Sequence, residues 1–69
     1  MKYLSEQYFL QKCIISAEDA KGSYAMMSHL AMDEQAKQVY SGMAHDIGRH
    51  LNYLNDRLKY LKQLDKTNC

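Results

Sequence analysis

Apolar side chains recur at steps of three and four residues through almost the whole chain, and no proline interrupts them. This spacing keeps side chains on one face of an α-helix, which turns once every ~3.6 residues. A half-buried strand would instead alternate apolar and polar residues at every second position. The pattern therefore predicts an all-α fold.

The pattern breaks only once, at Ala31-Met32-Asp33-Glu34. Asp33 is a suitable N-cap, because its carboxylate can accept hydrogen bonds from the free N–H groups of the following turn. Glu34 then adds negative charge where the helix dipole favours it. Such a short connection predicts an antiparallel helical hairpin. We expect one domain over residues 1–69, with helices at about 5–30 and 34–64, a turn at about 31–34 and a fraying polar tail at 65–69.

Each expected helix carries an apolar stripe along which the two would pack. The first stripe consists of Leu10, Cys13, Ala17, Ala20, Tyr24, Met27 and Ala31, widened by Ile14 and Leu30. The second consists of Ala36, Tyr40, Met43, Ile47, Leu51, Leu54, Leu58 and Leu61. Its steps depart from a strict seven-residue repeat, which favours a straight or slightly coiled bundle over a long coiled coil.

Two helices bury only the strip where they touch, so a 69-residue hairpin holds a marginal core. An apolar flank should stay partly exposed on an isolated hairpin, formed by Ile14, Leu30, Val39, Tyr53 and Tyr60. Such a flank normally marks an interface. We therefore expect a homodimer that forms a four-helix bundle, with another helical protein as the alternative partner. The residues expected in the core or this interface are Leu10, Ile14, Ala17, Tyr24, Met27, Val39, Tyr40, Met43, Ile47, Leu51, Leu54, Leu58 and Leu61.

The charges are balanced, with nine basic and eight acidic residues and a formal net charge of +1. This balance argues against nucleic-acid binding, and a small nucleic-acid-binding regulator remains only a weaker alternative. The apolar runs are too short to span a membrane, although peripheral association stays open. Glu6 and Gln7 interrupt anything like the apolar core of a signal peptide. We expect a cytoplasmic protein.

The two cysteines, Cys13 and Cys69, would lie about 25 Å apart along the expected hairpin, too far for a disulfide. Free thiols in a reducing compartment fit better, with Cys13 as a small core residue. A catalytic pair of Cys13 with His50 is the alternative that the sequence leaves open. The chain has no glycine-rich phosphate loop and no serine elbow motif, so we expect no enzymatic activity.

A metal-binding, ferritin-like half-bundle is the alternative reading, with His45, Asp46 and His50 as its candidate ligands. A di-iron bundle needs Glu-x-x-His pairs, and no glutamate here precedes a histidine by three residues. Thioethers and an imidazole could bind Cu(I), but Met26 and Met27 project about 100° apart on a helix. We expect no metal and no cofactor. The side chains that could form such a copper site are Met26, Met27, His29 and Met32.

One family pattern is visible once the helices are placed. The segment Asp33-Glu34-Gln35-Ala36-Lys37-Gln38-Val39-Tyr40 resembles an Asp-x-x-Ala-Lys-x-hydrophobic-aromatic motif of a short uncharacterised helical domain of endospore-forming Firmicutes, domain of unknown function 1657. The segment Leu54-x-x-Arg57-Leu58-x-Tyr60-Leu61 is similar to a later motif of the same family. A looser similarity is to ferritin-like spore coat proteins. Either resemblance implies a small helical protein linked to sporulation, with the forespore or spore as alternative locations, and supplies no catalytic residues to carry over.

Overall fold

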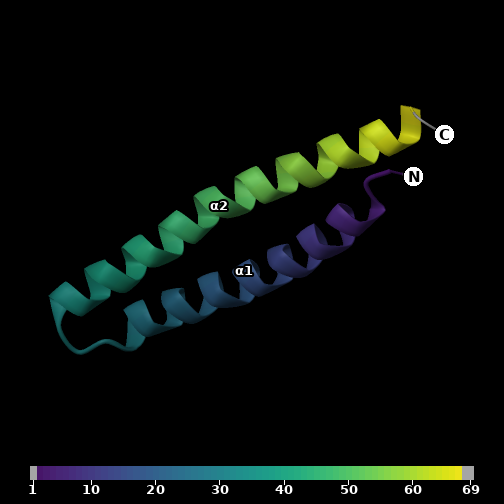
Figure 1. The fold of residues 1–69 in the computed structure, drawn as a ribbon. Coiled ribbons are helices and arrows are strands. Elements are labelled where there is room, and N and C mark those ends of the chain that lie inside the picture. The colour runs from purple at the N-terminus through teal and green to yellow at the C-terminus, as the bar shows by residue number, and fades with distance from the viewer. Residues whose placement is uncertain (1, 68–69) are drawn as a thin grey trace.

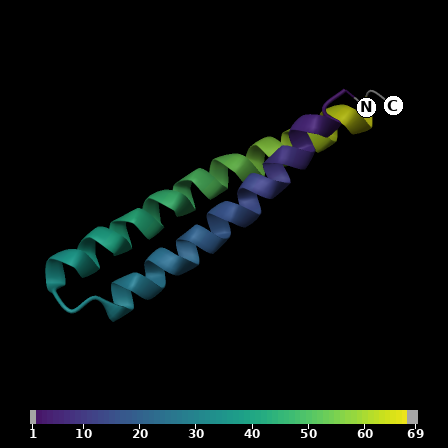
Figure 2. The ribbon, with the colours of Figure 1, turned by 60° about the horizontal axis from the view of Figure 1, so that its bottom comes forward.

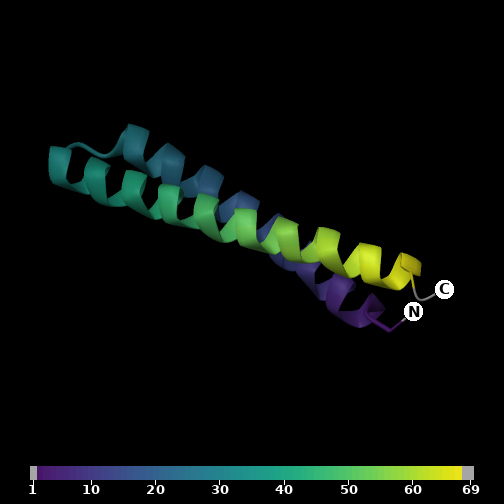
Figure 3. The same ribbon diagram turned by 90° about the horizontal axis from the view of Figure 1, so that it is seen from above.

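The computed structural model describes residues 2–67, which form two antiparallel helices, α1 (Leu4–Leu30) and α2 (Glu34–Thr67) (Figure 1). Both ends of the chain lie at the same end of the hairpin, opposite the turn. The hairpin measures 54 × 15 × 10 Å. Seen from two further directions, α1 crosses α2 at a shallow angle toward the terminal end (Figures 2 and 3). The predicted all-α hairpin is confirmed.

The turn follows the predicted capping chemistry. Ala31 adopts an extended conformation (φ −62°, ψ 140°), which ends α1. The Asp33 carboxylate accepts a hydrogen bond from the Ala36 N–H at 2.8 Å, so Asp33 is the N-cap of α2. Across the turn, the Ser28 hydroxyl donates to the backbone carbonyl of Lys37 at 3.0 Å. The two helix ends are therefore tied by side chain as well as by chain connectivity.

The helices pack along a strict seven-residue repeat, which we call the seam. Its positions alternate steps of three and four in both helices, as in a two-stranded coiled coil. Every seam residue is buried or half-buried except Lys21. The α1 side consists of Tyr3, Gln7, Leu10, Ile14, Ala17, Lys21, Tyr24, Ser28 and Ala31. The α2 side consists of Lys37, Tyr40, Ala44, Ile47, Leu51, Leu54, Leu58, Leu61 and Asp65.

This repeat corrects the sequence prediction for α2. Met43 is 42% exposed, whereas its neighbour Ala44 is 9% exposed and lies in the seam. Steps of three and four lead from Tyr40 to Ile47 through either position 43 or position 44. Only position 44 keeps the alternation that runs on both sides, so the larger methionine falls beside the contact line. The expected departure from a strict seven-residue repeat is therefore wrong.

The same shift applies to α1. Cys13, expected as a small core residue, is exposed, and Ile14, expected to stay partly exposed, is buried in the seam. Met27 also lies beside the seam and is 36% exposed, while Ser28 is half-buried. Apolar character alone could not decide between Cys13 and Ile14, because both side chains are apolar.

The terminal end of the hairpin is closed by polar groups. The expected fraying tail is wrong for residues 65–67, because α2 continues to Thr67 and Asp65 is buried. The Asp65 carboxylate accepts hydrogen bonds from the Tyr3 N–H at 3.1 Å and from the Gln7 amide at 2.5 Å. The remainder of that tail, including Cys69, lies outside the residues that the structure describes.

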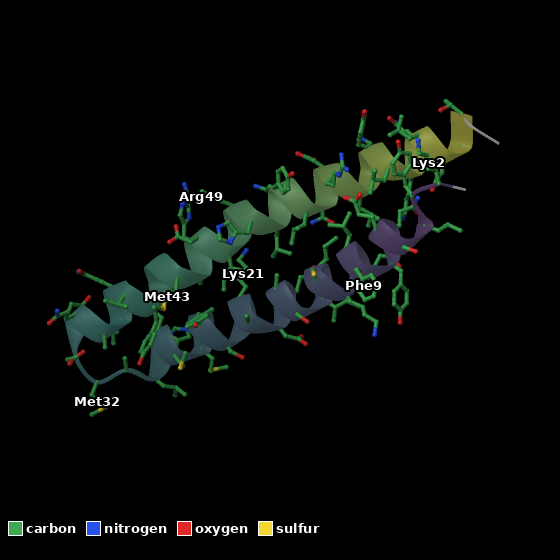
Figure 4. All side chains as sticks on the ribbon, in the orientation of Figure 1. Lys2, Phe9, Lys21, Met32, Met43 and Arg49 are labelled. Atoms are coloured by element: carbon green, nitrogen blue, oxygen red, sulfur yellow. The ribbon has the colours of Figure 1, made fainter. Side chains whose placement is uncertain are left out.

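Near the middle of the hairpin, a lysine crosses the seam. Lys21 extends from α1 toward α2 (Figure 4), and its Nζ lies 3.4 Å from where a Cβ would stand on Gly48. A Cβ at position 48 would make only ordinary van der Waals contact with Lys21, so the end of the lysine side chain lies against α2 at this position.

Candidate functional site

One long side of the hairpin carries a second pair of rows beside the seam, in which nine of the fourteen residues are apolar. In each row, every residue stands one position before a seam residue in the sequence. Both rows therefore follow alternating steps of four and three and lie on one flank of the seam. In antiparallel helices these two flanks adjoin. We call this surface the apolar face. Its α1 row is Phe9, Cys13, Ser16, Ala20, Ser23, Met27 and Leu30, and its α2 row is Val39, Met43, Asp46, His50, Tyr53, Arg57 and Tyr60.

The large apolar side chains of this face are exposed. Phe9, Leu30 and Tyr53 are 63%, 69% and 69% exposed, and Val39 and Tyr60 are about half exposed. Their exposure confirms part of the expected apolar flank, except for Ile14. Contiguous apolar side chains on the surface of a small protein are typical of an interaction site.

A groove runs between the two rows toward the terminal end. It has a volume of about 670 Å³ and is lined by Cys13, Arg49, His50, Tyr53 and Leu54. Its walls come from both helices, which shows that the α1 and α2 rows lie next to each other. The Cys13 thiol and the His50 imidazole, which the sequence left open as a catalytic pair, line this groove together.

An ion pair bounds the terminal end of the apolar face. The Arg57 guanidinium donates two hydrogen bonds to the Glu6 carboxylate, at 2.8 and 3.2 Å. The hydrogen bond from Arg57 holds the pKa of Glu6 below its ordinary value and raises the pKa of Arg57. Arg57 also lies over the ring of Tyr60, 5.7 Å from its centre. The pair neutralises both charges and orders the arginine beside an aromatic ring.

The rest of α2 is polar. Its outer positions give that helix one apolar side and one hydrated side. These positions carry Gln35, Gln38, Ser41, His45, Arg49, Asn52, Asn55, Asp56, Lys59, Lys62 and Gln63. Arg49 points outward from α2 (Figure 4), binds Asp46 at 3.0 Å and also lines the groove.

By contrast, α1 is apolar on several sides. Tyr8, Ile15 and Met26 are exposed at positions outside the seam and outside the apolar face. The Tyr8 and Phe9 rings contact each other edge to face at 5.3 Å, and the Lys12 ammonium lies 5.0 Å from the centre of the Tyr8 ring. A helix with apolar residues around most of its circumference is typical of one that is buried in an assembly.

The structure separates the candidate metal ligands. His45 lies on the polar side of α2, Asp46 is bound by Arg49, and His50 lines the groove. His45 and His50 are five residues apart, so they project about 140° from each other on a helix. Within residues 2–67, no three histidine, cysteine or acidic side chains lie close enough to hold a metal ion together. Of the expected copper ligands, Met32 is 99% exposed and points from the turn away from both helices (Figure 4).

Phe9 and Arg57 were missed as functional candidates by the sequence reasoning. The signal for Phe9 was available, since it stands four residues before Cys13 in the second α1 row. Arg57 could not be found this way, because its partner Glu6 lies 51 residues away. Its role depends on the register of the two helices.

Neither helix, over residues 2–67, contains a stretch long and apolar enough to cross a membrane. Comparison with curated proteins gives no match, and comparison with solved structures gives none either. A family model, described as protein of unknown function (DUF1657), matches residues 10–58. This match covers the seam from Leu10 to Leu58 and confirms the resemblance to domain of unknown function 1657. The chain therefore belongs to the DUF1657 family.

Proposed function

We propose that this protein is a non-enzymatic helical module that pairs with a second copy of itself through the apolar face. The observation that carries the proposal is the pair of heptad-spaced rows whose large apolar side chains are exposed on the hairpin. Packing two such faces together would give a four-helix bundle.

The surface area of the hairpin supports a partner of this size. The chain exposes 5411 Å², whereas a folded monomer of 8.1 kDa is expected to expose about 4,500 Å². The excess of about 900 Å² is close to the roughly 800 Å² that each partner buries in a standard protein interface. A second copy on the apolar face would remove an area of this order.

Matched glutamate substitutions test the proposal by sedimentation equilibrium. Val39→Glu places a charge on the apolar face, and Gln38→Glu places the same charge one residue away on the polar side. Tyr53→Glu and Asn52→Glu form a second matched pair. The wild-type chain and both polar-side variants should be dimers. Both face variants should be monomers, because a charge buried in the interface would lack a partner.

Circular dichroism separates loss of pairing from loss of folding. Val39 and Tyr53 are exposed on the hairpin, so their variants should keep a helical spectrum at concentrations where they are monomers. A wild-type chain that is monomeric at all concentrations would refute self-association. Face variants that remain dimers would show that the copies pair through another surface.

The cellular setting that we propose is sporulation, and it rests only on the sequence resemblance. Production confined to sporulating cells of the source organism would support this setting, and equal production during vegetative growth would contradict it.

A further inference from the structure

The apolar face has two chemically different ends. The end near the turn presents Met27, Leu30, Val39 and Met43, which are flexible thioethers and aliphatic groups. The terminal end presents aromatic rings, Phe9, Tyr53 and Tyr60. The α1 row between them is made of small residues, which would let two copies approach closely at the middle of the face.

The two ends of the hairpin also differ in charge. Residues 18–50, the half that contains the turn, hold five acidic and three basic side chains, a formal charge of −2. Residues 1–17 and 51–69, the half that contains the termini, hold six basic and three acidic side chains, a formal charge of +3. The near-zero net charge of the chain therefore hides a longitudinal charge difference.

We propose that two copies pair in antiparallel orientation, which we call head to tail. The copies are related by a two-fold axis that crosses the middle of the apolar face, perpendicular to the long axis of the hairpin. The turn end of each copy then lies on the terminal end of the other. This inference rests on the proposed self-association and adds the direction of pairing. Both contacts are equivalent by symmetry, as in an isologous dimer.

Head-to-tail pairing matches the two ends of the hairpin both in charge and in the chemistry of their apolar side chains. It sets the −2 half of one copy on the +3 half of the other, and a head-to-head pair would set like charges together. It also brings methionines against aromatic rings, a favourable contact for thioether sulfur. A head-to-head pair would instead stack methionines on methionines and rings on rings.

Pulsed electron–electron double resonance, which measures the distance between two spin labels, can determine the direction of pairing. The background is the full chain with Cys13→Ser and Cys69→Ser, and a spin label is attached at Gln35→Cys, near the turn on the polar side of α2. In a head-to-tail dimer the two labels lie near opposite ends of the assembly, about 50 Å apart given ~1.5 Å per helical residue. In a head-to-head dimer they lie within about 30 Å, roughly three helix diameters. A label at Asn52→Cys, near the middle of α2, is the control and should give similar distances in both arrangements.

Cross-linking of the unsubstituted chain gives an independent readout. In dimers mixed from ¹⁴N and ¹⁵N chains, a lysine-reactive reagent should join Lys37 of one copy to Lys66 of the other. Within one chain these lysines are about 43 Å apart along α2, too far for such a reagent.

The outcomes separate the two proposals. Long label distances and Lys37–Lys66 cross-links between copies support head-to-tail pairing. A dimer with short label distances and Lys37–Lys37 cross-links overturns the direction but leaves self-association intact. A wild-type chain that stays monomeric overturns both.

Discussion

The Gln7 side chain in the first turn of α1 donates a hydrogen bond to the Asp65 carboxylate in the last turn of α2, at 2.5 Å across 58 residues of sequence. Both side chains are buried at heptad positions that would ordinarily be apolar. The other Asp65 oxygen accepts a hydrogen bond from the N–H of Tyr3, the N-cap residue of α1. The Tyr3 side chain itself makes no capping hydrogen bond. One carboxylate thus fixes the register of the hairpin at the end that no loop connects.

Removing this carboxylate should destabilise the hairpin. Asp65→Ala leaves the buried Gln7 amide without that acceptor, and an unsatisfied buried polar group costs about 1–3 kcal/mol. Urea denaturation should show a loss of this order. Lys66→Ala, at the exposed neighbouring position, is the control and should change stability little.

The double variant Gln7→Leu with Asp65→Leu should be more stable than either single variant, because two apolar side chains replace two polar groups that need each other. If the double variant lost the sum of the single effects, the Gln7–Asp65 contact would not be the source of the stability.

The N-cap of α2 should contribute measurably. Asp33→Ala removes the acceptor for the Ala36 N–H and should lower the free energy of unfolding by about 1 kcal/mol, whereas Asp33→Ser keeps a capping oxygen and should lose little. Thermal or urea unfolding of the two variants checks this. Equal losses in both would show that the cap does not stabilise the turn.

The seam should tolerate truncation poorly. Leu61 is completely buried, and Leu61→Ala should cost about 2–5 kcal/mol through lost apolar contact and the cavity left behind. Leu4 is about half exposed, so Leu4→Ala is the matched control with the same chemical change. Similar losses in the two variants would contradict the assignment of Leu61 to the core.

The Glu6–Arg57 ion pair should make stability depend on acid pH. Because Arg57 lowers the Glu6 pKa in the fold, the pair stabilises the hairpin above the ordinary Glu6 value of 4.5. That contribution should fall as the pH drops below 4.5 and vanish below the lowered pKa, where Glu6 is protonated in both states.

The difference in unfolding free energy between wild type and Glu6→Gln, measured across this range, should therefore be small, positive at neutral pH and absent in acid. High salt should reduce it, because both side chains are exposed to solvent. Glu18→Gln, which changes another exposed glutamate of α1, should show no such convergence.

Periodicity and capping chemistry were enough to predict the two helices, the turn and the Asp33 cap, because these depend on residues within a few positions of each other. The choice between Met43 and Ala44, or Cys13 and Ile14, was not predictable in the same way. Neighbouring apolar residues on a helix differ only by rotation, and the partner helix decides which one faces inward. Asp65 was mistaken for a fraying tail because its stabilising contacts come from Tyr3 and Gln7, at the opposite end of the sequence.

The apolar face was predicted only in part. Val39, Tyr53 and Tyr60 were expected on it because they flank a recognisable stripe on α2. Phe9 was not, although it stands four residues before Cys13, because the α1 stripe predicted from the sequence begins at Leu10.

A native mass spectrum of the purified chain shows whether the hairpin pairs with itself. We expect a metal-free species of twice the chain mass at micromolar concentration. A folded, helical species of single chain mass under the same conditions would contradict it, and a stoichiometric metal ion in the measured mass would contradict the assignment of the histidines to surface roles.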